Sequence, residues 1–144
     1  MKPAKNAIAF VIYGKGGKTF LAVKRPANDE NLPNLWGLPA GRVEKNESFE
    51  DCVLRAGKEK LGVELKIVKK IGSGNLERKD YLLHLEDFEA EIVKGKPEVP
   101  QPAKDITQYV DWKWAVPEDL LEAAKKGSLC SRIFLDSLKI KWKI

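Results

Sequence analysis

Short hydrophobic runs alternate with polar, turn-forming segments along most of this chain. Residues 7–13 and 19–23 are rich in β-branched and aromatic residues, and the Lys15-Gly16-Gly17-Lys18 segment between them predicts a hairpin turn. The same pattern predicts further extended segments at residues 35–38, 42–43, 65–71, 81–93 and 109–115. Residues 72–80 are expected to form a polar turn, and the proline-rich residues 97–103 a loop.

Three segments carry the signals of helix ends. Ser48, followed three residues later by Asp51, predicts the start of a helix, and Gly62 predicts its left-handed end. Pro117 is placed like a first helical residue, and Gly127 is placed to end that helix. Residues 131–138 are expected to form a third helix. Strands interrupted by helices favour an α/β or α+β sandwich.

Length and composition narrow the class of protein. The 144 residues predict one domain, residues 1–144. Hydrophobic residues make up 43% and charged residues 33%, as is typical of a soluble globular protein, and no apolar run approaches the roughly 20 residues of a membrane span. We therefore expect a cytoplasmic protein without a membrane partner. Its oligomeric state stays open, a homodimer included. Cys52 and Cys130 are expected to be free, buried thiols.

The net charge of +5 affects the expected partners. It arises from 26 Lys and Arg against 21 Asp and Glu. Such an excess favours anionic partners, nucleotides or RNA among them. Because the charges are dispersed along the chain, a solvated Lys/Glu-rich surface is the favoured interpretation of the overall charge.

One segment combines fixed spacing with recognisable chemistry. Five residues separate Gly41 from Glu47, seven more separate Glu47 from Arg55, and Glu59 and Gly62 follow at fixed offsets. This segment resembles the signature box of the Nudix hydrolases, G-x5-E-x7-R-E-U-x-E-E-x-G-U, where U is a bulky aliphatic residue. Flanking segments resemble the family as well, at residues 8–25, 35–44 and 109–120.

The resemblance implies a fold and an activity. The fold is an α/β/α sandwich with a mixed β-sheet. The activity is hydrolysis of a pyrophosphate link in a nucleoside triphosphate or a nucleoside diphosphate derivative, with Mg2+ or Mn2+. The metal ion would neutralise phosphate charge and activate a water molecule.

The resemblance also assigns roles to individual residues. Glu59 is expected to be the main metal ligand, assisted by a backbone carbonyl near Gly41 and by a later acidic residue, either Glu98 or Asp105. Glu47 and Arg55 are expected to form the ion pair that joins the loop to the helix and to support catalysis. Oxygen ligands of this kind are what Mg2+ prefers.

The box departs from the family pattern at three positions. Ala56 and Lys60 replace two glutamates, which changes the local charge from about −3 to about 0. Gly57 replaces an aliphatic residue and offers no side chain to the core. These departures predict weak metal binding and leave two functions open. One is a hydrolase with a reduced metal site, and the other is a catalytically impaired Nudix-fold module that binds a nucleotide or RNA.

Basic and aromatic residues are the candidates for substrate binding. Lys60, together with Lys24, Arg25 and Arg42, could form a cationic phosphate pocket without a metal ion, although a surface lysine is the simpler interpretation of Lys60. Candidate base-stacking residues, for each of which core packing is the alternative, are Trp36, Phe88, Tyr109, Trp112 and Trp114. His84, the only histidine, is interpreted as structural.

Overall fold

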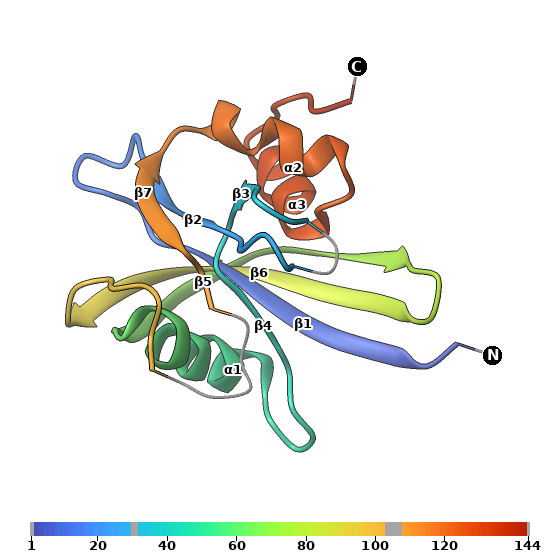
Figure 1. Ribbon diagram of the computed structural model, residues 1–144, viewed down its shortest axis with the longest axis horizontal. Coiled ribbons are helices and arrows are strands. Elements are labelled where there is room, and N and C mark those ends of the chain that lie inside the picture. The colour runs from blue at the N-terminus through green and yellow to red at the C-terminus, as the bar shows by residue number, and fades with distance from the viewer. Residues whose placement is uncertain (1, 30–31, 103–107, 144) are drawn as a thin grey trace.

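Two β-sheets form the centre of the molecule (Figure 1). The computed structural model describes residues 2–29, 32–102 and 108–143. One sheet has the order β4-β1-β6-β5, with the bounds Ala40–Arg42, Ala4–Val11, Leu82–Lys94 and Glu64–Glu77. This sheet is mixed, because β1 runs parallel to β6, whereas the β1–β4 and β5–β6 pairs are antiparallel. The other sheet is antiparallel, in the order β3-β2-β7, with the bounds Trp36–Gly37, Phe20–Lys24 and Asp111–Ala115.

Helices cover the two opposite faces of these strands. On one face lies α1 (Phe49–Ala56), which continues as the π-helical segment η1 (Gly57–Leu61). The other face carries the 3-10 segment η2 (Pro117–Leu120), α2 (Leu121–Lys125) and α3 (Leu129–Ser137) (Figure 1). The predicted α+β sandwich with a mixed sheet is therefore confirmed.

Alternation along β1 explains why both faces carry helices. Ile8 and Phe10 are fully buried in the cluster that includes the inner face of α1. Ala9 and Val11 are fully buried in a second cluster, which includes the inner face of α3. Successive side chains of a strand point to opposite faces, so one apolar run holds helices on both sides.

The helix that follows the box loop begins as the sequence predicts. The Ser48 side chain accepts a hydrogen bond from the backbone N–H of Asp51 at 3.0 Å. Gly62 ends the helix with a φ of +71°. Its last turn is π-helical rather than α-helical, and this turn begins at Gly57. A Cβ atom at Gly57 would lie 2.5 Å from Cδ1 of Leu65, so the buried leucine fills the space that a larger residue would need.

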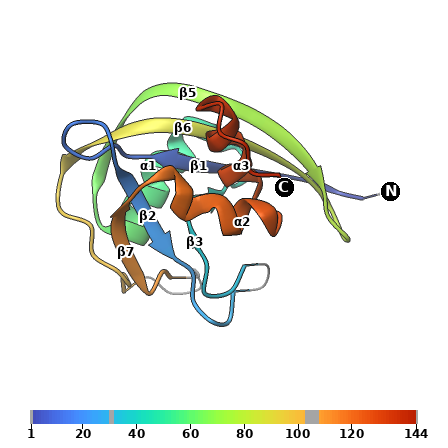
Figure 2. The same cartoon turned by 90° about the horizontal axis from the view of Figure 1, so that it is seen from above.

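The prediction of a polar turn at residues 72–80 is wrong. Strand β5 continues to Glu77, and the turn spans only residues 78–81, where the Arg78 N–H donates to the Tyr81 carbonyl at 2.8 Å. The glycines of this stretch serve packing, because a Cβ atom at Gly72 would lie 3.1 Å from Cγ2 of Ile133 in α3. The long β5–β6 hairpin consequently reaches past the core, and its tip lies beside the N-terminal end of β1 (Figure 2).

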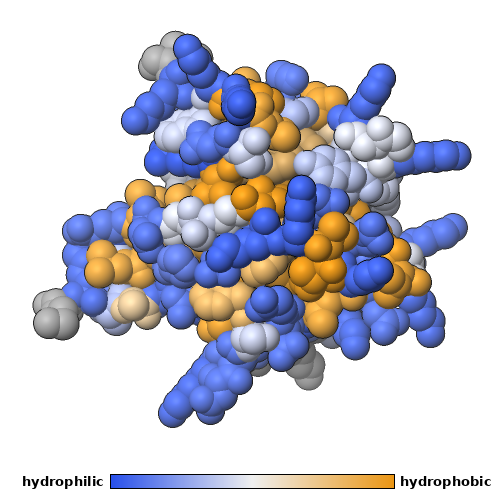
Figure 3. All heavy atoms as spheres, turned by 180° about the vertical axis from the view of Figure 1, so that it is seen from behind, coloured by the Kyte–Doolittle hydropathy of each residue, from blue (hydrophilic) through white to orange (hydrophobic). Residues whose placement is uncertain are grey.

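Two further predictions concern a turn and the cysteines, and both are confirmed. The hairpin turn at residues 15–18 is confirmed by a 2.8 Å hydrogen bond from the Gly14 N–H to the Thr19 carbonyl. Cys52 and Cys130 are free and buried. Hydrophilic side chains cover much of the rear face, with smaller hydrophobic areas among them (Figure 3). No helix within the described ranges is long and apolar enough to cross a membrane.

We expect Gly57→Ala to destabilise the protein, although this change in a helix normally adds stability. The added methyl group would overlap Leu65, and overpacking of this kind costs about 1–3 kcal/mol. Chemical denaturation measures the cost. In a Leu65→Ala background the same change should cost far less, because the overlap is gone. Equal costs in the two backgrounds would contradict this explanation of the glycine.

Candidate functional site

A pocket of about 700 Å³ opens beside the box helix, between β4, the start of β1 and the loop that follows β2. Basic side chains line much of it: Lys5, Arg25, Arg42, Lys45, Arg55 and Lys60. Three carboxylates line it as well: Asp29, Glu44 and Glu59. Its volume lies within the range that is usual for small-molecule sites.

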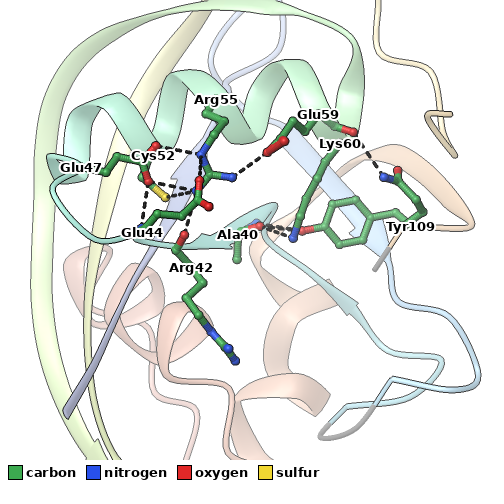
Figure 4. Close-up of polar contacts among 10 residues, drawn as sticks. Ala40, Arg42, Glu44, Glu47, Cys52, Arg55, Glu59, Lys60 and Tyr109 are labelled. Carbon is green, nitrogen blue, oxygen red and sulfur yellow. Dashed lines mark hydrogen bonds and ion pairs between the residues drawn. The ribbon is translucent and has the colours of Figure 1, made fainter. Parts of the chain in front are cut away.

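Arg55 joins the parts of the site (Figure 4). Its Nε and Nη2 donate to the two carboxylate oxygens of Glu47 at 2.7 and 2.9 Å. Its Nη1 donates to Glu59 at 2.6 Å, and its Nη2 also donates to the backbone carbonyl of Arg42 at 2.8 Å. Glu44 lies 3.1 Å from Nε. One planar guanidinium thus ties the box loop, strand β4 and Glu59 of the helical segment together, as its five donors allow.

These contacts set the charge states of the groups around Arg55. Its hydrogen bonds to Glu47 hold the pKa of that carboxyl at about 2. The same bonds raise the pKa of Arg55 above its ordinary value. Burial raises the pKa of the Cys52 thiol to about 12, so Cys52 is a neutral core residue rather than an anionic ligand. The predicted ion pair between Glu47 and Arg55 is present.

Lys60 points into the site and does not extend into solvent (Figure 4). Its Nζ donates to the backbone carbonyl of Ala40 at 2.6 Å and lies 5.2 Å from the centre of the Tyr109 ring. The Tyr109 hydroxyl accepts from the Ala40 N–H at 2.8 Å and donates to the Ala40 carbonyl at 3.2 Å. The lysine, the tyrosine and β4 therefore form one bonded unit.

The residues of this pocket do not fit a divalent metal site of the kind the resemblance implies. Within the described parts of the chain, no three His, Cys, Asp or Glu side chains lie close enough together to hold a metal ion. One oxygen of Glu59 is bound by Arg55, and the Ala40 carbonyl next to Gly41 accepts from both the ammonium of Lys60 and the Tyr109 hydroxyl. Glu98 is exposed, does not line the pocket, and donates its backbone N–H to Leu61. Asp105 lies outside the described residues.

The other substrate-binding candidates are divided between the pocket and its surroundings. Arg25 and Arg42 line the pocket, Arg25 lying 3.8 Å from Asp29, whereas Lys24 does not line it. Of the aromatic candidates only Tyr109 lines it, and Phe88 is buried in the core. The lining residues that were not predicted from the sequence include Lys5, Asp29, Lys45 and Tyr81.

Two of the missed residues are brought to the pocket by pairing between distant segments. Strand β1 pairs in parallel with β6, which aligns Lys5 with Leu83. Lys5 also lies over the Tyr81 ring, at 4.5 Å from its centre. No local pattern in the sequence signals that register, because the paired segments are nearly 80 residues apart.

The fold agrees with comparisons to known proteins. The family model of the NUDIX domain matches residues 2–137. This chain belongs to the Nudix family. The MutT NUDIX hydrolase from Burkholderia pseudomallei superposes with a TM-score of 0.75 over 95% of this chain and 99% of that one, at 22% identity. At that identity the likeness concerns the fold alone.

Sequence relatives carry different substrates in their names. The NAD-capped RNA hydrolase NudC of Pseudomonas aeruginosa is 32% identical over 110 residues, 76% of this chain. The match spans 36% of that relative's length. The CTP pyrophosphohydrolase of Escherichia coli is 25% identical over 115 residues, which are 80% of this chain and 78% of that one. Nudix pyrophosphohydrolases act on nucleotide compounds with the help of divalent metals, and these names do not select one substrate.

We expect the Glu47–Arg55 pair to make stability depend on acid pH. The pKa of Glu47 is lowered from 4.5 to about 2, so the pair stabilises the fold above pH 4.5 and is lost as pH falls toward 2. At pH 7, Glu47→Gln should lower the free energy of unfolding by about 1–3 kcal/mol. Urea denaturation at a series of pH values measures this.

The difference between the wild type and Glu47→Gln should shrink steadily between pH 4.5 and pH 2. Glu91→Gln is the matched control, because Glu91 is an exposed carboxylate of β6. A Glu47→Gln effect that stays constant across this interval would contradict the assignment.

Proposed function

We propose that this chain binds the phosphate groups of a nucleotide, either a nucleoside triphosphate or a nucleoside diphosphate derivative, and that its hydrolysis of pyrophosphate is impaired. The charge of the pocket is the observation that supports this proposal. Six basic side chains line the pocket against three carboxylates. Each of these carboxylates lies within 4 Å of an arginine, Asp29 beside Arg25 and both glutamates beside Arg55. The uncompensated charge is positive and suits a phosphate chain.

The rest of the pocket suits the nucleoside part of such a ligand. Its volume of about 700 Å³ can enclose a mononucleotide-sized molecule. Tyr81, which is only partly buried, lines its wall, whereas the lining residue Tyr109 is buried. Tyrosine supplies apolar contact area and a polar hydroxyl together, which matches a base and a ribose.

A hydrolase with a reduced metal site is the second candidate, and two observations favour it. The Glu59 side chain lines the pocket, and the pair of Glu47 and Arg55 that fixes the box loop is intact. Glu59 would then be the principal ligand of an Mg2+ or Mn2+ ion, with Gly41 and Glu98 as the further ligands that the family resemblance suggests. For that role Glu59 would use its second carboxylate oxygen, because Arg55 holds the first at 2.6 Å.

RNA is a further proposed ligand class. A phosphate chain at the end of an RNA offers the same groups as a free nucleotide, and one relative is named for hydrolysis of NAD-capped RNA. The net charge of +5 is compatible with a polyanion. Binding that weakens steeply with salt would indicate contacts to several phosphates beyond the pocket.

We expect nucleotide binding to depend on Arg42. Its side chain is exposed and lines the pocket. Arg55 donates to the backbone carbonyl of Arg42, so removal of the Arg42 guanidinium leaves that hydrogen bond in place. Arg42→Ala should therefore weaken the binding of ADP-ribose, NADH or a nucleoside triphosphate about tenfold, equivalent to about 1.4 kcal/mol. Isothermal titration calorimetry measures it, with Lys125→Ala on α2 as the control. Absence of binding across the whole panel would reject the proposed function.

Turnover separates the two candidates. With Mg2+ or Mn2+ and the same panel of nucleotides we expect slow hydrolysis at most. The family box has glutamates at three positions of the helix, and this chain keeps only the one at position 59. Glu59→Gln is the control, and phosphate release measures the rate. Rapid turnover that disappears in Glu59→Gln would replace the binding module by the hydrolase with a reduced metal site.

A further inference from the structure

The ammonium of Lys60 occupies a defined place in the pocket. Its Nζ is held at 2.6 Å from the Ala40 carbonyl and 5.2 Å from the centre of the Tyr109 ring (Figure 4). Tyr109 is fully buried and bonds both backbone groups of Ala40, so the carbonyl that Lys60 meets is itself fixed. A lysine that served only to solvate the helix would extend away from the protein, whereas this one lines the cavity.

An ammonium in this position has capacity for a ligand. It carries three N–H donors and no acceptor. Among the described residues its hydrogen bonds account for one donor, to the Ala40 carbonyl. Lys60 is partly exposed toward the pocket, so its other donors can reach a bound group. The charge is attracted to phosphate oxygens, and N–H···O bonds between charged groups are the stronger kind.

The neighbouring positions of the box disfavour a dication at the same place. Position 56 is alanine, and the helix packs directly on β4 there. A Cβ atom added to Gly41 would lie only 3.2 Å from the Cβ atom of Ala56. The carboxylate of Glu59 is bound by Arg55 at 2.6 Å. A metal ion beside Ala40 would meet the positive charge of Lys60 and would have to displace its hydrogen bond.

We propose that Lys60 is a resident cation that binds a ligand phosphate directly, so that the pocket takes nucleotide phosphates without a divalent metal ion. The inference rests on the proposed function and adds to it the group that neutralises the phosphate. Arg42, at the exposed mouth of the same pocket, supplies a second cation for the phosphate chain. Metal-independent affinity is thus a property of this chain's own side chains.

Calorimetric titration with ADP, in EDTA and in excess Mg2+, tests the inference. The wild type should bind ADP with the same affinity, within about twofold, in both buffers. Lys60→Met keeps the aliphatic stem and removes the charge, and it should weaken ADP binding at least tenfold, with no recovery in Mg2+. Lys58→Met, on the same turn but exposed and outside the pocket, is the matched control and should bind ADP normally.

Mn2+ binding followed by electron paramagnetic resonance gives a readout that needs no nucleotide. The wild type should leave Mn2+ free, and Lys60→Glu, or Ala56→Glu combined with Lys60→Glu, should gain a bound Mn2+. Circular dichroism checks that each variant is folded, and Lys60→Met decides the matter if neither glutamate variant folds.

The failures of the two proposals are distinguishable. Wild-type binding of ADP that is unchanged in Lys60→Met, or that requires Mg2+, overturns the role of Lys60 and leaves the proposed nucleotide function standing. Tight Mn2+ binding to the wild type also overturns the role of Lys60 and leaves the proposed nucleotide function standing. A wild type that binds no nucleotide in either buffer rejects the proposed function and this inference with it.

Discussion

The hydrogen bonds of Arg55 are the constraint on which the site depends. The guanidinium connects Glu47 in the loop, the Arg42 carbonyl in β4 and Glu59 in the helical segment. Without the guanidinium, the two carboxylates and the Arg42 carbonyl would lie near one another beside the helix with no cation between them. Because a bidentate arginine–carboxylate contact fixes direction as well as distance, it sets the angle between loop and helix. The walls of the pocket follow from that angle.

Holding Glu59 in this way has a chemical consequence. Arg55 binds one oxygen of the Glu59 carboxylate at 2.6 Å, so another cation would approach Glu59 through its second oxygen. In a box with further glutamates at positions 56 and 60, other carboxylates would surround a metal ion and leave the arginine its partners. In this chain a metal ion would share Glu59 with the arginine and would meet alanine and lysine at the other two positions. The structural half of the box is therefore retained, whereas two of its three glutamate positions hold other residues.

The sequence predicted features that depend on nearby residues and missed those that depend on distant ones. The cap at Ser48, the left-handed Gly62 and the ion pair of Glu47 with Arg55 arise from residues within one segment, and all were predicted. The extent of β5 was misjudged, because glycines usually indicate turns and the space at Gly72 is filled by a residue of α3. Lys5 joins the pocket only through the register of β1 against β6, which no local pattern encodes.

Lys60 shows why a departure from a family pattern has to be interpreted in three dimensions. From the sequence it was compatible with a solvated lysine or with a phosphate ligand. In the structure its Nζ contacts the carbonyl of Ala40, the same group that the buried hydroxyl of Tyr109 holds in place. A substitution that merely abolished metal binding would need no such partners. The bonded unit of lysine, tyrosine and β4 places one positive charge at a fixed point in a pocket that remains open to solvent, which is what an anion-binding site requires.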